Sequence, residues 1–257
     1  MSDNINIGVI PAAGKGTRLS DLPLTKVLPK VMLPILNKPI LEYNVKIMKK
    51  MGITEIFIII NDKKQIIMDY FGDGSEFGIK INYVLQPNLL GIADAIDQVS
   101  KFLTSPFIVI LGDSFIINDN ICDAITQFRR KQAYAVECVI EEHDVESIKR
   151  SCNVSMNDDN QIIELIEKPQ TPKTNLRGMG IYVLHPIIFE YITKTQIAPP
   201  RNEREITNTL MLMAQQTGRV YASPFRGKEI NINKIDDLIN ATKLMLAVNN
   251  DINLNPI

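Results

Sequence analysis

The chain has 257 residues, of which 45% are hydrophobic and 22% are charged. This composition predicts a well-filled globular core and excludes an intrinsically disordered chain. The 28 basic and 29 acidic residues give a formal net charge of −1, so neither nucleic acid nor an anionic membrane is expected as the main partner.

Three cysteines, Cys122, Cys138 and Cys152, are an odd number without CxxC spacing. This pattern argues against a disulfide framework or a structural zinc site and favours a reducing compartment. Residues 1–6 include Ser, Asp and two Asn, and the longest apolar runs are too short to cross a bilayer. We therefore expect a cytoplasmic protein, for which both a monomer and a homo-oligomer remain open.

In the first half of the chain, short β-branched runs alternate with helical patterns. Buried strands are predicted at Ile5–Ile10, Glu55–Ile60, Ile79–Leu85 and Phe107–Leu111. Helices are predicted at Pro39–Met51, Lys63–Phe71 and Ile92–Phe102. Because strands alternate with helices, we expect an α/β fold with a doubly wound, mostly parallel sheet.

The second half of the chain is less regular. Further strands are predicted at Ala133–Ile140, Ile162–Ile166, Gly180–Leu184 and Val220–Ser223. The segment Glu229–Ile232 connects the last of these strands to the closing helix. Helices are predicted at Pro186–Thr193, Glu203–Gln216 and Ile235–Val248. Because no repeat or low-complexity linker divides the chain, we expect one domain over residues 1–257, with substrate-binding additions in its second half.

The turn after the first strand is the strongest functional signal. Residues 11–39 have the sequence PAAGKGTRLSDLPLTKVLPKVMLPILNKP, and an open α/β sheet binds ligands beyond the carboxyl ends of its strands. Gly14 and Gly16 let the backbone approach a triphosphate, and their amides can donate to its oxygens. Lys15 and Arg18 add cationic donors. Lys30 follows in the same segment and could neutralise charge that develops on a phosphoryl group.

Two common phosphate-binding motifs fit this turn less well. A dinucleotide fingerprint needs a third glycine where this chain has Leu19, and a Walker A loop needs GxxxxGK followed by Ser or Thr, which does not occur. A glycine-rich turn with solvated basic residues would account for the short Gly motif alone. It does not account for the whole stretch of residues 11–39.

This segment closely resembles the signature of sugar-1-phosphate nucleotidyltransferases, in which G-x-G-T-R is followed by a lysine. PAAG at 11–14 and TKVLPKVMLP at 25–34 are most similar to bacterial UTP–glucose-1-phosphate uridylyltransferases, and thymidylyltransferases are a looser match. The resemblance implies a Rossmann-like nucleotidyltransferase fold with catalytic roles for Lys30 and Arg18. It also implies that the phosphates are bound by Ala12, Ala13, Gly14, Lys15, Gly16, Thr17 and Arg18.

Two later motifs extend the resemblance to the base and the metal. Gln86 ends the third predicted strand, and Gly91 opens the next helix. At these two positions the family recognises the pyrimidine base. A Gln side chain both donates and accepts hydrogen bonds, as the edge of uracil or thymine requires. Termination of the strand at Gln86 and a helix cap at Gly91 would account for the same two residues. Asp113 closes the fourth strand, where one carboxylate is a natural Mg²⁺ ligand and where the family places its main metal-binding Asp.

Motifs later in the chain resemble those with which the family contacts the sugar. Glu167-Lys168-Pro169 resembles the E-K-P element that contacts the sugar and its phosphate, although such a pair is usually solvated and worth little. Gly180 and Tyr182 match a G-x-Y-V-L strand that lines the sugar pocket, and either Gly178 or Gly180 could instead mark a bulge. The implied sugar-binding residues are Gly112, Glu167, Lys168, Gly180 and Tyr182.

The chain departs from the family pattern at several positions. Asn231 stands where relatives have an Asp that gives the metal a second carboxylate, and an amide oxygen is a weaker ligand for a hard cation. Cys152 follows Ser151 where many relatives have a Tyr-Gly pair beside the sugar. Asp94 stands where relatives commonly have His or Gln, and Asn208 where uridylyltransferases usually have Asp.

Together these motifs predict a Mg²⁺-dependent transfer of a nucleotidyl group from UTP or dTTP to a sugar 1-phosphate. No general base is needed, because the attacking phosphate is already anionic, and His143 and His185 lie outside every phosphate motif. The resemblance divides the domain into a nucleotide-binding half, 1–132, and a sugar-binding half, 133–257. Asn231 and Cys152 leave open a catalytically silent sugar-nucleotide-binding or regulatory homologue. A transferase that uses CTP or another phosphorylated alcohol is a further alternative.

Overall fold

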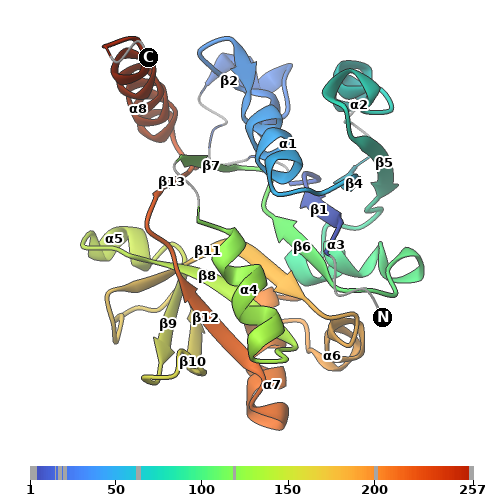
Figure 1. Ribbon diagram of the computed structural model, residues 1–257, viewed down its shortest axis with the longest axis vertical. Helices are drawn as coiled ribbons and strands as arrows, with labels where there is room; N and C mark the ends of the chain where they lie inside the picture. Colours follow the sequence, from blue (N-terminus) through green and yellow to red (C-terminus); the bar gives the residue numbers. More distant parts are fainter. Residues whose placement is uncertain are drawn as a thin grey trace.

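The computed structural model describes residues 5–14, 16, 19, 22–61, 65–117, 120–199 and 202–254, with the side chains of 249–254 excepted. Nine of the described strands form one sheet that runs through the molecule (Figure 1), and two small two-stranded sheets lie beside it. The helices pack on both faces of the large sheet.

The first half of the chain builds the parallel part of this sheet. Its four strands stand in the order β6-β1-β4-β5 and are all parallel to their neighbours. They are β1 (Ile7–Pro11), β4 (Glu55–Ile60), β5 (Lys80–Leu85) and β6 (Phe107–Ile110). The strand–helix alternation of the sequence therefore predicted this part correctly.

Apolar side chains on the two faces of these strands form two separate clusters. One contains Ile10 and Ile58 and is covered by α1 (Ile40–Lys50), α2 (Gln65–Phe71) and α4 (Cys122–Arg130). The other contains Val9 and Ile59 and is covered by α3 (Ile92–Asp97), α6 (Ile188–Lys194) and α7 (Ile206–Thr217). Both faces of β1, β4 and β6 are thus buried, as expected for runs without polar alternation.

The second half continues the same sheet with mixed strand directions. The strand β11 (Leu176–Leu184) pairs antiparallel with β6 and with β8 (Ala135–Glu141), and β8 pairs parallel with β12 (Val220–Pro224). The antiparallel pair β9 (Cys152–Met156) and β10 (Ile162–Glu167) completes the far edge, and α5 (Val145–Ile148) precedes it. The predicted mostly parallel central sheet with β-rich additions is confirmed.

A smaller layer lies beside the end of the parallel strands. In it β7 (Ser114–Ile117) pairs with β13 (Lys228–Asn231), and β2 (Pro34–Ile35) pairs with β3 (Lys38–Pro39). The last helix, α8 (Ile235–Leu254), packs on β2 and β13 and stands at one corner of the molecule in Figure 1. Short 3₁₀ turns occur at Pro23–Lys26, Lys30–Met32, Ser75–Phe77 and Ser100–Phe102.

Some boundaries differ from the sequence predictions. The helix predicted at Ile92–Phe102 ends at Asp97, and a 3₁₀ turn follows, which lets both Val99 and Leu103 be buried. The structure also contains elements that were not predicted, namely β2, β3, β7, β9, β13, α4 and α5. None of the described helices has the length and apolarity needed to span a bilayer.

Candidate active site

A cavity of about 530 Å³ opens at the carboxyl ends of β1 and β6 and extends to the strands of the second half. Most of the residues implied by the sequence line it. These are Ala12, Ala13, Gly14, Gly16, Lys30, Gln86, Gly91, Asp113, Glu167, Lys168, Gly180, Tyr182 and Asn231. Of the remaining implied residues, Lys15, Thr17 and Arg18 lie outside the described residues.

The turn after β1 is fixed to the neighbouring strand. The amide of Ala12 donates to the carbonyl of Ile59 at 2.8 Å, and the side-chain amide of Asn61 donates to the carbonyl of Ala13 at 2.7 Å. These bonds hold the backbone of the turn at the edge of the sheet before any ligand binds. Such preorganisation lowers the cost of binding.

Gly16 brings this turn against Lys30. Its φ of +65° is in the left-handed region, which favours glycine, and a Cβ at this position would lie 3.1 Å from the Cβ of Lys30. The glycine therefore allows the lysine stem to pass directly beside the turn. Lys30 itself begins a 3₁₀ turn, in which Val31 and Met32 are buried and anchor the backbone.

Four polar side chains form a network at the base of the turn. The Lys30 Nζ atom donates to Asp113 Oδ2 at 2.6 Å and to Asn233 Oδ1 at 3.3 Å. The Asn233 side-chain amide in turn donates to Asn231 Oδ1 at 3.0 Å. Asp113 follows β6 and the two asparagines follow or end β13, so the network joins the large sheet to the small one.

Gly112, implied as a sugar contact, lies behind the wall of the cavity and is not among its lining residues. Its amide donates to the carbonyl of Pro11 at 3.1 Å, and a Cβ there would lie 2.9 Å from the same oxygen. This glycine allows the ends of β1 and β6 to approach closely. Its observed contacts are therefore with the sheet.

Gln86 is buried, and its amide group is already engaged. Its Nε2 atom donates to Asp94 Oδ2 at 2.8 Å and to the carbonyl of Gly91 at 3.2 Å. Asp94 thus has a clear role, because it holds the Gln86 amide in one orientation. Gly91 has a φ of +104°, and a Cβ there would lie 2.6 Å from the carbonyl oxygen of Arg204, so this position requires glycine.

Glu167 and Lys168 lie at the opposite end of the cavity. The two side chains form an ion pair of 2.9 Å, and the hydroxyl of Thr207 donates to Glu167 Oε2 at 2.8 Å. Lys168 has a φ of +47°, and its amide donates to the carbonyl of Ser151. A left-handed non-glycine residue costs free energy and is common at functional sites, so its position over the cavity supports a functional role.

The bulge that the sequence allowed in β11 is present. The register between β11 and β8 shifts between Gly178 and Tyr182, and Gly180 has a φ of +71°. A Cβ at Gly180 would lie 2.4 Å from the Leu111 side chain. The bulge places Tyr182 in the cavity wall, where burial and nearby acidic groups raise the pKa of its phenol.

Several residues that line the cavity were missed from the sequence. Asn233, Glu205 and Thr207 lie in or next to segments for which only a helix or strand was predicted. Glu137 is the most unusual, since it lies in the middle of the buried strand β8 and is 1% exposed. The interruption of an apolar run by a single carboxylate was the signal that could have identified it.

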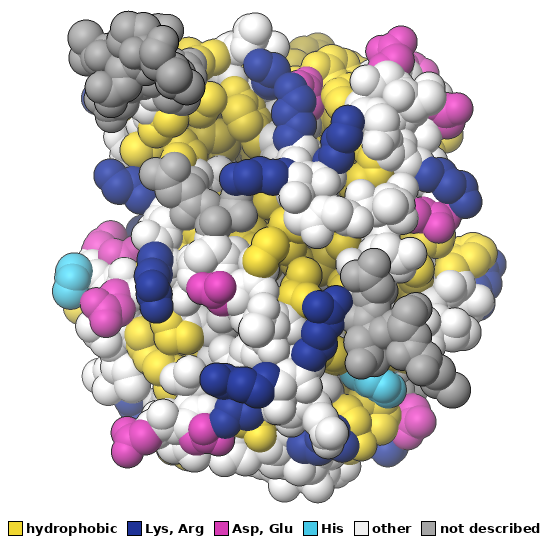
Figure 2. Space-filling model, viewed as in Figure 1, with side chains coloured by type: hydrophobic (Ala, Val, Ile, Leu, Met, Phe, Trp, Pro, Cys, Tyr) yellow, Lys and Arg dark blue, Asp and Glu magenta, His cyan; other side chains and the backbone are white. Residues whose placement is uncertain are grey.

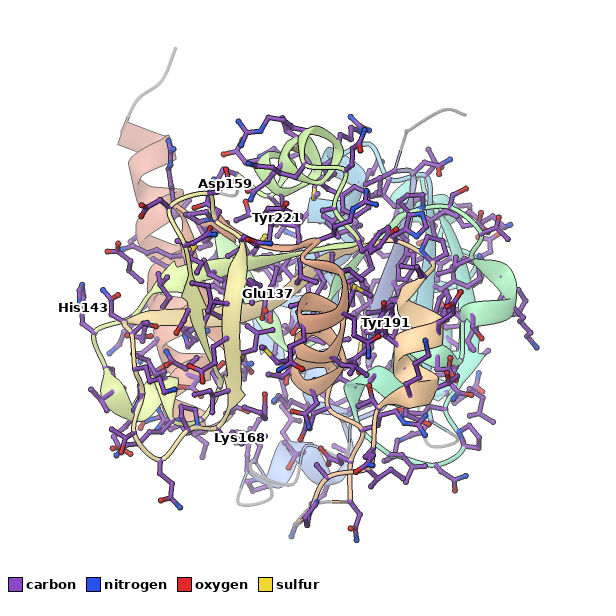
Figure 3. All side chains as sticks on the ribbon, turned by 90° about the horizontal axis from the view of Figure 1, so that it is seen from below. Glu137, His143, Asp159, Lys168, Tyr191 and Tyr221 are labelled. Atoms are coloured by element: carbon purple, nitrogen blue, oxygen red, sulfur yellow. The ribbon has the colours of Figure 1, made fainter. Side chains whose placement is uncertain are left out.

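The histidines lie apart from this site. Figure 3 shows His143 at the periphery, whereas Glu137 lies in the interior between the strands of the second half and α7. His185 caps the start of the next turn, where its Nδ1 accepts from the amide of Ile187 at 3.1 Å. Burial and Arg219 lower the pKa of His185.

The surface shown in Figure 2 carries basic and acidic side chains that are interspersed. Neither sign forms a continuous field on this face, in agreement with the formal net charge of −1. The free thiols of Cys138 and Cys152 are buried, and Cys122 is exposed.

The model of the nucleotidyl transferase family matches residues 7–247. The chain belongs to this family. Its members include the low-salt glycan biosynthesis nucleotidyltransferase Agl11 of Haloferax volcanii, which is 33% identical over 93% of this chain and 66% of its own length. The UTP–glucose-1-phosphate uridylyltransferase AglF of the same organism is 32% identical over 89% of this chain and 92% of its own.

The chain spans just under two thirds of Agl11 and, at 65%, of the glucose-1-phosphate thymidylyltransferase of Streptomyces griseus, which is 31% identical. Among solved structures of the family, a UDP-glucose pyrophosphorylase complexed with UDP-glucose superimposes with a TM-score of 0.84. It is 28% identical, and the match covers 95% of this chain and 99% of that one. The predicted family and fold are thereby confirmed.

Proposed function

We propose that the chain transfers a nucleotidyl group from UTP or dTTP to a sugar 1-phosphate and releases pyrophosphate. The observation that supports this most directly is the Lys30–Asp113 pair of 2.6 Å beside the glycine turn, in a cavity that also contains Glu167 and Lys168. A cation beside a phosphate-binding turn and a second polar group across the cavity suit two phosphate-bearing substrates.

The reaction is an in-line displacement. An oxygen of the acceptor phosphate attacks the α-phosphorus, a new P–O bond forms, and the bond to the β-phosphate oxygen breaks, so that pyrophosphate leaves with the electron pair. Lys30 offsets negative charge at the α-phosphate, and Lys168 orients the acceptor phosphate. Catalysis then consists of positioning and charge neutralisation.

Gln86 provides the contact with the base. Because its Nε2 donates to Asp94 and Gly91, its carbonyl Oε1 is the group left to accept a hydrogen bond from a ligand. The N3–H of uracil or thymine suits this acceptor, and so does the amino group of cytosine. An acceptor alone does not distinguish these bases, so CTP belongs in the test.

A Mg²⁺ ion fits the donor set at the network of Asp113, Asn231 and Asn233. Mg²⁺ is usually held by one or two carboxylates together with substrate phosphates, and Asp113 supplies one carboxylate beside two amide oxygens. No group of three or more His, Cys, Asp or Glu suited to a metal occurs among the described residues. When bound, the ion would neutralise phosphate charge.

We further propose that residues 1–132 bind the nucleotide and residues 133–257 bind the acceptor. The turn after β1, Lys30 and Gln86 belong to the first half, whereas Glu167, Lys168 and Tyr182 belong to the second. The buried free thiols are compatible with a cytoplasmic protein.

The test is pyrophosphate release from each nucleoside triphosphate paired with several sugar 1-phosphates. We expect turnover with UTP or dTTP, and Lys30→Ala should lower kcat by about a hundredfold or more, the usual cost of removing one group that stabilises developing charge. Lys80→Ala is a matched control, because Lys80 forms an exposed pair with Glu55 on β4 and should leave kcat unchanged.

Calorimetry with the same nucleotides distinguishes the catalytically silent alternative from an active enzyme. Binding of UTP or dTTP without pyrophosphate release from any pair would show a binding or regulatory protein. Equal turnover by the Lys30→Ala and Lys80→Ala variants would contradict the role assigned to Lys30.

A further inference from the structure

Glu137 is a buried carboxyl group that the proposed mechanism does not use. It lies in the middle of β8, with Tyr182 of β11 on one side and Ala222 of β12 on the other. It is 1% exposed, yet it lines the cavity. Its side chain therefore faces the cavity from the floor of the sheet.

The Glu137 carboxyl group lacks the contacts that normally compensate burial. Its Oε2 atom has no hydrogen-bond partner among the described residues. Burial and the nearby Glu167 together raise its pKa to about 8. Since a buried polar group without a partner costs free energy, folding alone gives no reason for a carboxyl at this position.

The fold leaves room for this side chain. Gly178 of β11 lies close to the carboxyl group, and a Cβ there would lie 2.2 Å from Glu137 Oε1 and 3.3 Å from the Cβ of Cys152. The absence of a side chain at 178 thus creates the space that the carboxyl group occupies. Gly178 and Glu137 therefore fit each other, and the carboxyl group occupies space that the fold provides for it.

The groups around Glu137 are mainly acidic or aromatic. Glu167 and Glu205 line the same part of the cavity, and Tyr182 contributes its ring to the wall. Each described cation that lines the cavity is paired with a carboxylate other than Glu137. A ligand group with positive charge would therefore compensate the charge of an ionised Glu137 beside Glu167, and an aromatic ring nearby also favours a cation.

We propose that the acceptor bound by this site carries a primary ammonium group, which donates a hydrogen bond to Glu137. This inference rests on the proposed nucleotidyl transfer and specifies its acceptor class. A neutral hydroxyl group would supply a donor but no charge, so it could not compensate an ionised Glu137 beside Glu167. An ammonium group supplies both.

Two sources share this chemistry: an amino sugar 1-phosphate and the phosphate ester of an amino alcohol. Glucosamine 1-phosphate and glucose 1-phosphate form one matched pair of probes. Phosphoethanolamine and propyl phosphate form the other, in which the ammonium group is replaced by a methyl group. Comparison of the two pairs identifies the source.

The first measurement is kcat/KM for pyrophosphate release with these four acceptors. We expect the wild-type protein to prefer the ammonium member of one pair by about tenfold or more, because a charge-assisted hydrogen bond typically contributes that much. Glu137→Gln should reduce the preference to less than about threefold. Glu141→Gln, at the exposed end of the same strand, should keep it.

The second measurement is calorimetry of the unmodified protein in two buffers of different ionisation enthalpy near pH 7. Glu137 binds a proton in the free protein and should release it when it pairs with the ammonium group. The observed enthalpy should therefore depend on the buffer for the ammonium probe and not for its neutral partner. This measurement does not require that the Glu137→Gln variant folds.

Equal kcat/KM values and buffer-independent enthalpies for both members of each pair would overturn the inference while leaving nucleotidyl transfer intact. Pyrophosphate release from no acceptor would instead contradict the proposed function. In that case the calorimetry with the ammonium probes still decides the inference. Failure of every ammonium probe to bind would overturn it.

Discussion

Glu137 has a position that an apolar residue would fill at lower cost. Its neighbours Val136 and Cys138 pack in one core cluster, and Ala135 and Val139 pack in the other. A single carboxyl group in such a strand conflicts with burial, and conflicts of this kind are expected at functional sites. The conflict has a measurable effect on the free protein, because it couples protonation to folding.

We predict that the unliganded protein loses stability as the pH rises. The pKa of Glu137 is about 8 in the folded protein and near 4.5 when the group is solvated, so between these values the folded state binds more protons than the unfolded state. The contribution of Glu137 is then fully present below about pH 4.5 and is lost progressively up to about pH 8. At about 1.4 kcal/mol per pKa unit, the loss is on the order of a few kcal/mol.

Urea unfolding from pH 5 to pH 8 tests this prediction. The buried Glu229 also has a raised pKa and acts in the same direction, so the informative quantity is the difference between wild type and Glu137→Gln. This difference should grow with pH in favour of the variant. A constant difference would show that Glu137 is ionised in the folded protein throughout.

The residues that sequence analysis found lie in segments that follow strands or match the family signature. Asp113 follows β6, and Gly16 and Lys30 lie in the segment after β1, which predicts a position at the edge of the sheet. Glu137 and Asn233 could not be found in this way. Their side chains reach the cavity only because of the pairing of β8 with β11 and the turn after β13.

At the scale of single elements, β11 shows the same limit. The sequence predicted a strand at Gly180–Leu184, whereas the strand begins at Leu176 and contains a bulge. Alternation of side chains predicts a regular strand, but the shift of register depends on the partner β8. The bulge decides that Tyr182 faces the cavity, and Gly180 makes it possible.

We predict that Gly180→Ala destabilises the protein more than Gly52→Ala. Both glycines have positive φ angles, +71° and +84°, so each variant has a conformational cost of roughly 1–2 kcal/mol. Gly52 has free space around it, whereas a Cβ at Gly180 would lie 2.4 Å from Leu111, two residues before Asp113. Overpacking should add about 1–3 kcal/mol.

The measurement is urea unfolding of both variants together with kcat for pyrophosphate release. Gly180→Ala should also lower kcat, since Leu111 must shift beside the Lys30–Asp113 pair. Equal free energies of unfolding for the two variants would mean that the bulge can relax without moving Leu111.

At the scale of the whole molecule, one buried ion pair links the two sheets of the site. Arg177 lies in β11 of the large sheet, and its guanidinium donates to Glu229 of β13 at 2.8 Å. Both side chains are shielded, at 7% and 0% exposure. Because β13 ends at Asn231, this pair helps to hold the strand that carries the asparagines of the site.

The arrangement of the sheets was only partly predictable for this reason. The strand–helix alternation of the first half predicted parallel strands, and these strands stand in the order β6-β1-β4-β5. By contrast, β7 and β13 are separated by more than a hundred residues, and their pairing depends on contacts such as Arg177–Glu229. Charged residues in short strands give no local signal of such a partner.

We predict that Arg177→Met destabilises the protein by about 3–5 kcal/mol, because it leaves Glu229 buried without its partner. The double variant Arg177→Met/Glu229→Met should recover most of this loss, since replacement of a whole buried pair by apolar residues is often neutral. Glu55→Gln, at the exposed pair with Lys80, should cost less than about 1 kcal/mol. Urea unfolding of these variants measures each free energy. If the double variant is no more stable than Arg177→Met alone, the loss comes from packing of the arginine stem and the charge of Glu229 is tolerated without a partner.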